Sequence, residues 1–175
     1  VALLLGCCVV WGLGQVATKL GLSEIPPLMQ AAVRSLGAAL LLVAWSRSRG
    51  LALWRADGTG RGGLLAGTLF ALEFGCIFVG LQYTSASRMS VFIYLAPFVV
   101  ALGMPLIARS ERLDRWQTLG LVIAFGGVVW AYFEGFAQPT AGPRQWLGDA
   151  LGLTGAVLWG LTTLVLRGSR LGSAL

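Results

Sequence analysis

Six long apolar stretches, separated by short segments that hold most of the charge, constrain this chain more than any other feature. Each has about the 20 residues that a helix needs to cross the hydrocarbon core of a bilayer. Only 11% of the 175 residues are charged, whereas soluble domains carry about 25%, so a water-facing surface could not be covered. We therefore predict an all-α bundle of six transmembrane helices: Val1–Leu22, Leu28–Ser46, Gly63–Leu81, Met89–Ile107, Trp116–Phe133 and Leu147–Leu166.

The arginines between these stretches predict the orientation of the chain. The segments after the second, fourth and sixth stretches hold nine of them, and the alternate segments hold two, Arg88 and Arg144. Because basic residues concentrate on the cytoplasmic side, we expect a multi-pass protein with a cytoplasmic N-terminus, typical of a bacterial inner membrane. This pattern also explains the formal net charge of +6 without nucleic-acid binding.

Small residues and a short repeat indicate how the helices are organised. Gly63 and Gly67, and the row Gly148, Gly152, Ala156 and Gly160, have the four-residue spacing that allows helices to approach closely.

A short motif occurs twice in the chain. The first span contains Trp11-Gly12-Leu13 followed by Lys19, and the last contains Trp159-Gly160-Leu161 followed by Arg167. In both cases the basic residue comes eight residues after the tryptophan. Five spans separate the two starts, so the matching helices run in opposite directions, as in an inverted-repeat transporter. We expect residues 1–135 to form a first five-helix repeat, and residues 136–175 to form an external loop and the first helix of a second repeat, after which the chain is truncated.

Four segments of the chain resemble, in order and spacing, the EamA-type transporters of the drug/metabolite transporter superfamily. They are Trp11-Gly12 with Lys19; Pro27 with Arg34; the run from Leu81-Gln82-Tyr83-Thr84-Ser85-Ala86 through Leu95-Ala96-Pro97 to Glu111-Arg112-Leu113 and Gly126-Gly127-Val128; and Gly148-Asp149 leading to Trp159 and Arg167.

The resemblance implies two inverted five-helix repeats around a central substrate cavity. It implies a secondary transporter of small metabolites, amino acids or drugs, with export favoured and proton coupling left open. The expected partners are a small-molecule substrate and the lipid bilayer, with either a second copy of the chain or a missing C-terminal repeat to complete the fold.

Apart from Asp149 at the very start of the sixth, three charged side chains lie within predicted spans: Lys19, Arg34 and Glu73. A charge at the middle of a span costs about 2.5–3.5 kcal/mol on insertion scales, so Glu73 should be protonated, paired or reached by a water-filled cavity. It is either a carboxylate for proton coupling or cation binding, or a structural link to a neighbouring helix. Lys19 and Arg34 either extend to the outer interface or line the outer mouth and attract anionic groups.

Other candidates for the substrate or proton pathway are uncharged. Trp11 and Gln15 share a helix face with Lys19, which suits either a cavity wall or helix packing. Ser90, Tyr94 and Pro97 form a second set near mid-membrane. Pro97 should kink its helix, and the freed carbonyl either serves a substrate or is satisfied by packing.

The sequence disfavours catalysis. It has no histidine, and Cys7, Cys8 and Cys76 all lie within apolar stretches, so we expect no metal site, no cofactor and no enzyme activity. The alternative to a transporter is a non-transporting membrane scaffold or an inactive truncated transporter fragment.

Overall fold

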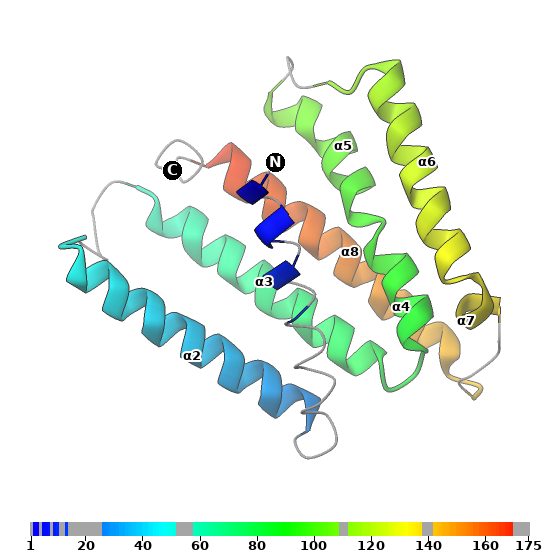
Figure 1. Cartoon of the computed structure of the whole chain (residues 1–175), viewed down its shortest axis with the longest axis horizontal. Helices are drawn as coiled ribbons and strands as arrows, with labels where there is room; N and C mark the ends of the chain where they lie inside the picture. Colours follow the sequence, from blue (N-terminus) through cyan, green and yellow to red (C-terminus); the bar gives the residue numbers. More distant parts are fainter. Residues whose placement is uncertain are drawn as a thin grey trace. The chain divides into compact units, whose positions relative to one another are not determined.

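In the computed structural model, all the regular secondary structure of the described residues is helical (Figure 1). It describes residues 26–51, 58–108, 112–137 and 142–169, and residues 2, 3, 5–7, 9, 10 and 13 near the start. The chain divides into two compact units, Val1–Leu53 and Trp54–Leu175, and each is described by itself.

The first unit contains α2, Pro27–Ser48, where a span was predicted from Leu28. Pro27 suits the first helical position, because its fixed backbone angle is helical and its missing N–H would be unpaired there. The helix ends in a Schellman motif: the Leu51 N–H donates to the Ser46 carbonyl (2.9 Å) and the Gly50 N–H donates to the Arg47 carbonyl (3.0 Å). Gly50 has a φ of 66°, a left-handed conformation that glycine adopts without strain.

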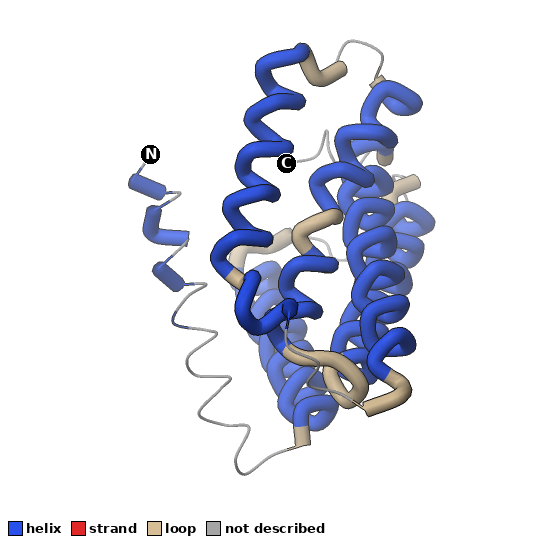
Figure 2. The backbone as a smooth tube through the Cα atoms, turned by 90° about the vertical axis from the view of Figure 1, so that its right-hand side faces the viewer, coloured by secondary structure: helices blue, strands red, loops and turns tan. Residues whose placement is uncertain are grey.

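The second unit is built around α8, which packs mainly against α3 and then against α5 and α4. Gly148, at the start of α8, lies beside Gly80 at the end of α3, while Gly155 lies beside Glu73. The two helices therefore run antiparallel. Figure 2 shows the helices in blue and the short loops that link them in tan. The elements are α3 (Gly60–Gly80), α4 (Ala86–Ile93), α5 (Ala96–Ile107), α6 (Arg115–Ala131), α7 (Phe133–Ala137) and α8 (Gln145–Gly168).

The predicted row of small residues in α8 forms the packing face of this helix. Gly148, Gly152 and Gly160 are buried, and Ala156 is 0% exposed. A Cβ atom on Gly148 would lie 2.7 Å from the Thr84 nitrogen and 2.8 Å from the Gly80 carbonyl oxygen, so only glycine permits this approach.

The other predicted pair of small residues, Gly63 and Gly67, has a different environment. In the described structure a Cβ atom on either residue would meet nothing within 4 Å. This pair in α3 therefore does not make a close helix contact within the second unit.

The predicted kink at Pro97 is confirmed as an interruption of the helix. A single span was expected from Met89 to Ile107, but α4 ends at Ile93 and α5 begins at Ala96. Pro97 has no N–H to donate to the carbonyl of Ile93, and its ring crowds that carbonyl. The chain therefore turns at Tyr94, whose N–H donates to the Ser90 carbonyl (3.1 Å).

Among the described residues, three helical stretches are long and apolar enough to cross a membrane: Gly60–Gly80, Ala86–Ile107 and Gln145–Gly168. They correspond to the third, fourth and sixth predicted spans. Helices α2 and α6 occupy the positions of the second and fifth, and most of Val1–Leu22 lies outside the described residues. The number of six spans and the truncated inverted repeat stay predictions.

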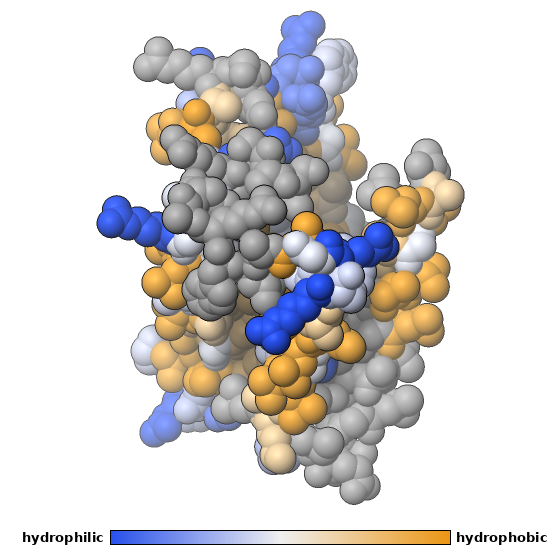
Figure 3. Space-filling model, turned by 90° about the vertical axis from the view of Figure 1, so that its left-hand side faces the viewer, coloured by the Kyte–Doolittle hydropathy of each residue, from blue (hydrophilic) through white to orange (hydrophobic). Residues whose placement is uncertain are grey.

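The surface of these helices is apolar. Leu102, Leu106 and Trp130 are 80%, 88% and 84% exposed. Figure 3 shows exposed apolar side chains, in orange, in several patches beside hydrophilic side chains in blue. Water would disfavour so much exposed apolar surface, whereas the hydrocarbon of a bilayer accommodates it.

Candidate functional site

Glu73 lies in the middle of α3 and is 3% exposed. The other buried residues of α3 are Ala66 and Gly80. Their seven-residue spacing from Glu73 places all three on one helix face, and Gly80 shows that this face meets α8. Within the described part of the chain, Glu73 Oε2 is buried and has no hydrogen-bond partner.

The segment of α8 opposite Glu73 is apolar or small. A Cβ atom on Gly155 would lie 3.9 Å from the Glu73 carbonyl oxygen, and α8 carries no ionisable side chain between Asp149 and Arg167. The buried hydroxyl of Thr162 donates to the Leu158 carbonyl within its own helix (2.8 Å). Helix α8 therefore offers Glu73 no counter-ion.

A polar cluster joins α4 to the start of α8. Arg88 donates from Nε to Asp149 Oδ1 (3.1 Å) and from Nη2 to Asp149 Oδ2 (2.5 Å). The buried Thr84 donates a further hydrogen bond to Asp149 Oδ1 (2.7 Å). Such a two-bond arginine–carboxylate pair fixes direction as well as distance, so the cluster holds the first turn of α8 against the α3–α4 turn.

Helix α4 is also held on its α7 side. Ser85 is its N-cap residue: the side-chain oxygen accepts from the Arg88 N–H (3.2 Å) and the hydroxyl donates to the Gly135 carbonyl of α7 (3.3 Å). An N-cap of this kind satisfies one of the free N–H groups of the first turn. The N-terminal end of α4 is thus fixed by both α7 and α8.

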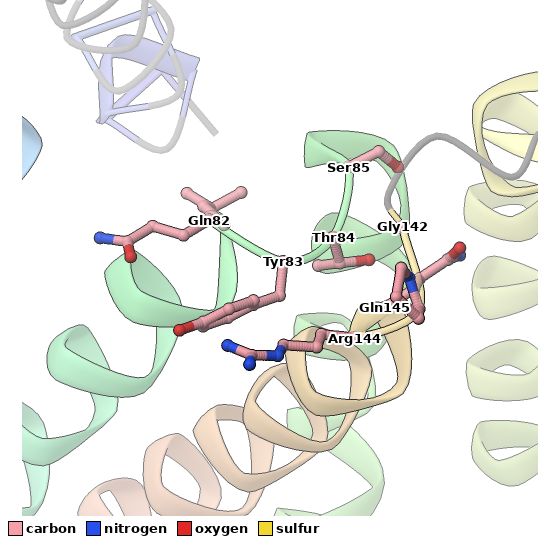
Figure 4. A pocket seen from close by; sticks show the side chains of 9 residues that line it. Gln82, Tyr83, Thr84, Ser85, Gly142, Arg144 and Gln145 are labelled. Carbon is pink, nitrogen blue, oxygen red and sulfur yellow. The ribbon is translucent and has the colours of Figure 1, made fainter.

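An open pocket of about 530 Å³ lies beside this cluster, between the α3–α4 turn and the residues that precede α8. Figure 4 shows Gln82, Tyr83 and Thr84 on the first wall and Arg144 with Gln145 on the second. The pocket is polar at its rim, and it contains none of the residues predicted as pathway candidates.

A second cavity, of about 370 Å³, is a groove between α5 and α6. Phe98 and Phe125 meet edge to face beside it, with ring centroids 5.3 Å apart. Apart from Gln117 its lining is apolar: Pro97, Val100, Ala101, Met104, Leu113, Gln117 and Leu121.

The comparison with known proteins agrees with the membrane character of these helices. Residues 1–133 match the model of the EamA-like transporter family. The chain belongs to this family. It is therefore a membrane protein of a transporter family, as the resemblance implied.

Curated relatives carry transporter names. The EamA-like chain is 31% identical to transporter YvbV of Bacillus subtilis over 98% of its own length and 56% of the relative. It is 24% identical to transporter YoaV of the same organism, over 89% of its own length and 52% of the relative. It is 30% identical to a probable amino-acid metabolite efflux pump of Salmonella typhimurium, over 69% of its own length and 38% of the relative.

The EamA-like chain thus spans about half the length of the curated relatives that it matches. No solved structure matches it significantly.

The predicted pathway residues of this EamA-like chain have different surroundings in the described structure. The hydroxyl of Ser90 donates to the Ala86 carbonyl (2.8 Å), Tyr94 is 51% exposed, and Pro97 lines the α5–α6 groove. No described contact joins these three to Glu73. Arg34 is exposed on α2 in the first unit. Trp11, Gln15 and Lys19 lie outside the described residues.

Sequence reasoning missed the Arg88–Asp149 pair. Arg88 was counted only as an outer base, and Asp149 only as part of a family pattern. A signal was nevertheless present: the chain has seven acidic residues, and both Asp149 and Arg88 fall at span ends on the same predicted side of the membrane. Opposite charges in that setting should have been considered as partners.

Proposed function

We propose that this chain is part of a secondary transporter that exports small metabolites, amino acids or drugs across the cytoplasmic membrane and is coupled to protons through Glu73. Membership of the EamA-like family supports transport. The name of the Salmonella relative, a probable amino-acid metabolite efflux pump, supports export and the substrate class. The observation that carries the proton coupling is the buried carboxyl of Glu73, whose Oε2 has no partner in the described structure.

Glu73 can bind and release one proton if its surroundings change during transport. An ionised carboxylate without a partner is strongly disfavoured in an apolar environment, so the packed arrangement of α3 and α8 suits the neutral acid. Contact with water or a cation stabilises the ionised form. A carboxyl that alternates between the two settings carries a proton each time that the cavity changes side.

The topology of the working transporter is part of the same proposal. We assign residues 1–135 to a first repeat and residues 136–175 to the start of a second, with the N-terminus in the cytoplasm of a bacterial cell. The distribution of nine arginines against two supports this orientation. The end of the family match at residue 133 supports the boundary. The remaining helices come from sequence after Leu175 or from a second copy of the chain.

The rival function is that of a non-transporting membrane scaffold or an inactive truncated transporter fragment. The chain spans 56% of its relative YvbV, and the experiment below distinguishes transport from this alternative.

Transport in proteoliposomes tests the proposal. The chain is reconstituted both alone and together with any residues that are encoded after Leu175. The release of labelled amino acids is then measured with and without a proton gradient. We expect the gradient to stimulate transport, and the Glu73→Gln variant to transport without stimulation. Glu134→Gln, an exposed glutamate of α7, is the matched control and should keep the stimulation.

Two results would contradict the proposal. Gradient stimulation that survives in Glu73→Gln removes Glu73 from the coupling. The absence of transport in both forms of the protein, with correct folding shown by a cooperative thermal transition, favours the scaffold.

A further inference from the structure

The line along which α3 and α8 touch leaves almost no free space. We call it the α3–α8 seam, and it extends from Gly80 and Gly148 to Glu73 and Gly155. A Cβ atom on Gly80 would lie 3.3 Å from the Gly148 carbonyl oxygen, and one on Gly155 would lie 3.4 Å from Ile77 Cγ1. Glycine in α8 is what lets the two backbones approach so closely.

Glu73 lies in this seam. It is 3% exposed, and neither of the two pockets described above includes it. A buried water needs two to four polar partners, and a substrate amine needs more room than a water. The ligand that fits Glu73 in this arrangement is therefore a proton.

The charged groups near the seam lie at its ends. Arg88 and Asp149 bond each other at the Gly148 end, and Arg167 lies in the last turn of α8. Arg61 precedes Glu73 by 12 residues in α3, which is about 18 Å along a helix. Of the side chains that α3 and α8 contribute near Glu73, only the Cys76 thiol is titratable.

We propose that the protonation state of Glu73 controls whether the α3–α8 seam is closed. With a proton bound, the carboxyl is neutral and the seam packs as described. When the proton passes to water, a carboxylate remains between two apolar helix faces, and α3 and α8 separate until water or a cation reaches it. This inference rests on the proposed role of Glu73 as the proton site of the transporter.

Polar bonds hold the Gly148 end of the seam. The bonds of Arg88 and Thr84 to Asp149 hold α8 beside the α3–α4 turn, and the glycine contact at Gly148 lies next to them. On the other side of Glu73, Ala66 of α3 and Thr162 of α8 are buried, and the Thr162 hydroxyl donates within its own helix to the Leu158 carbonyl. We expect the helices to separate at Glu73 while the bonds to Asp149 keep them together at Gly148.

One substitution turns the native Cys76 into a reporter of the seam. A Cβ atom at position 155 would lie 4.0 Å from the Cys76 Cβ, within the range of about 3.5–4.5 Å found in disulfides. Gly155→Cys, in a background with Cys7→Ser and Cys8→Ser, therefore allows a cross-link between α3 and α8 one helical turn from Glu73.

The control pair lies at the fixed end of the seam. Gly80→Cys and Leu151→Cys, with Cys76→Ala in the same background, place two Cβ atoms about 3.2 Å apart, slightly closer than in most disulfides. To admit them, the flexible methyl end of Met89 must shift and the Gly148 carbonyl must give slightly. Thiol oxidation becomes faster as pH rises, because the thiolate is the reactive form. The control pair should follow that trend.

The pair at Cys76 should depart from that trend. We expect its cross-linking rate, relative to the control pair, to fall at least about tenfold from acidic to alkaline buffer, because one proton changes a population by up to tenfold per pH unit. Adding Glu73→Gln should remove the fall and keep the seam closed at every pH. A ratio that does not depend on pH, or a fall that persists in Glu73→Gln, overturns the inference.

Labelling of Cys76 provides a second measurement if Gly155→Cys does not fold. In the chain with Cys7→Ser and Cys8→Ser, the rate of reaction with a membrane-permeant maleimide should rise more steeply with pH than it does in the same chain with Glu73→Gln. Equal slopes overturn the inference. Neither measurement requires transport. If the seam depends on pH but transport is not stimulated by a proton gradient, the proposed function is refuted and this inference stands.

Discussion

Arg88 and Asp149 form an ion pair that joins α4 to α8 through two hydrogen bonds, of 3.1 and 2.5 Å. The two side chains are only 17% and 18% exposed, and they are 61 residues apart in the sequence. Asp149 also accepts a hydrogen bond from Thr84. The cluster therefore joins the start of α8 to α4 and to the α3–α4 turn.

Removal of one partner of this pair should destabilise the protein. In Arg88→Leu the Asp149 carboxylate loses two of its three hydrogen bonds while staying mostly buried, which costs about 1–3 kcal/mol. Thermal unfolding of the purified protein in detergent measures the loss. The double variant Arg88→Leu with Asp149→Leu should regain part of it, because no unpaired charge remains. The control Arg144→Leu replaces an exposed arginine on the same predicted side and should have no effect on the unfolding temperature. If Arg88→Leu unfolds at the same temperature as the unchanged protein, this account of the pair is refuted.

A methyl group at Gly148 should weaken the contact between α3 and α8. The added Cβ would lie 2.7 Å from a backbone nitrogen and 2.8 Å from a backbone oxygen, and neither atom can move alone. We expect Gly148→Ala to cost about 1–3 kcal/mol, as overpacking does. Gly63→Ala is the control, because its Cβ would meet nothing within 4 Å in the described structure. Denaturant titration compares the two variants, and similar midpoints would show that the seam is looser than described.

The first turn of α6 should depend on Asp114. Asp114 Oδ1 accepts from the N–H groups of Trp116 (2.7 Å) and Gln117 (2.8 Å), and Gln117 Oε1 accepts in return from the Asp114 N–H (3.0 Å). Loss of such a capping box costs about 0.5–2 kcal/mol. Asp114→Ala should therefore speed amide hydrogen exchange in the first turn of α6, while Asp114→Asn, which keeps an acceptor, should change it little. Exchange that is unaltered in Asp114→Ala would contradict the capping role.

Features that depend on local sequence could be predicted, and those that depend on how distant helices meet could not. The spacing of Gly148, Gly152 and Gly160 identified the packing face of α8, because a four-residue period places small residues on one side of any helix. Pro97 identified the interruption between α4 and α5, since a proline removes a backbone donor wherever it stands.

The arrangement around Glu73 and Asp149 needed the tertiary structure. The depth of Glu73 in its span followed from the sequence, but three environments were open: a protonated acid, an ion pair or a water-filled cavity. Only the packing of α8 on α3 shows that this neighbour supplies no charge. The partnership of Asp149 with Arg88 likewise depends on where α8 begins relative to α4, which no local pattern specifies.

Glu73 should reduce stability while it serves transport, and replacing it with leucine separates the two effects. Leucine has a similar volume and no polar atoms, so Glu73→Leu removes a buried carboxyl oxygen that has no partner in the described structure. An unsatisfied buried polar group costs about 1–3 kcal/mol, and we expect the variant to be more stable by that order. Its thermal unfolding temperature in detergent should rise, whereas Glu134→Leu, at an exposed position of α7, should leave the temperature unchanged. The same Glu73→Leu protein should show no stimulation by a proton gradient in proteoliposomes. A lower unfolding temperature would mean that Glu73 makes a stabilising interaction in the membrane-embedded chain, and its assignment as an unpaired proton site would then fail.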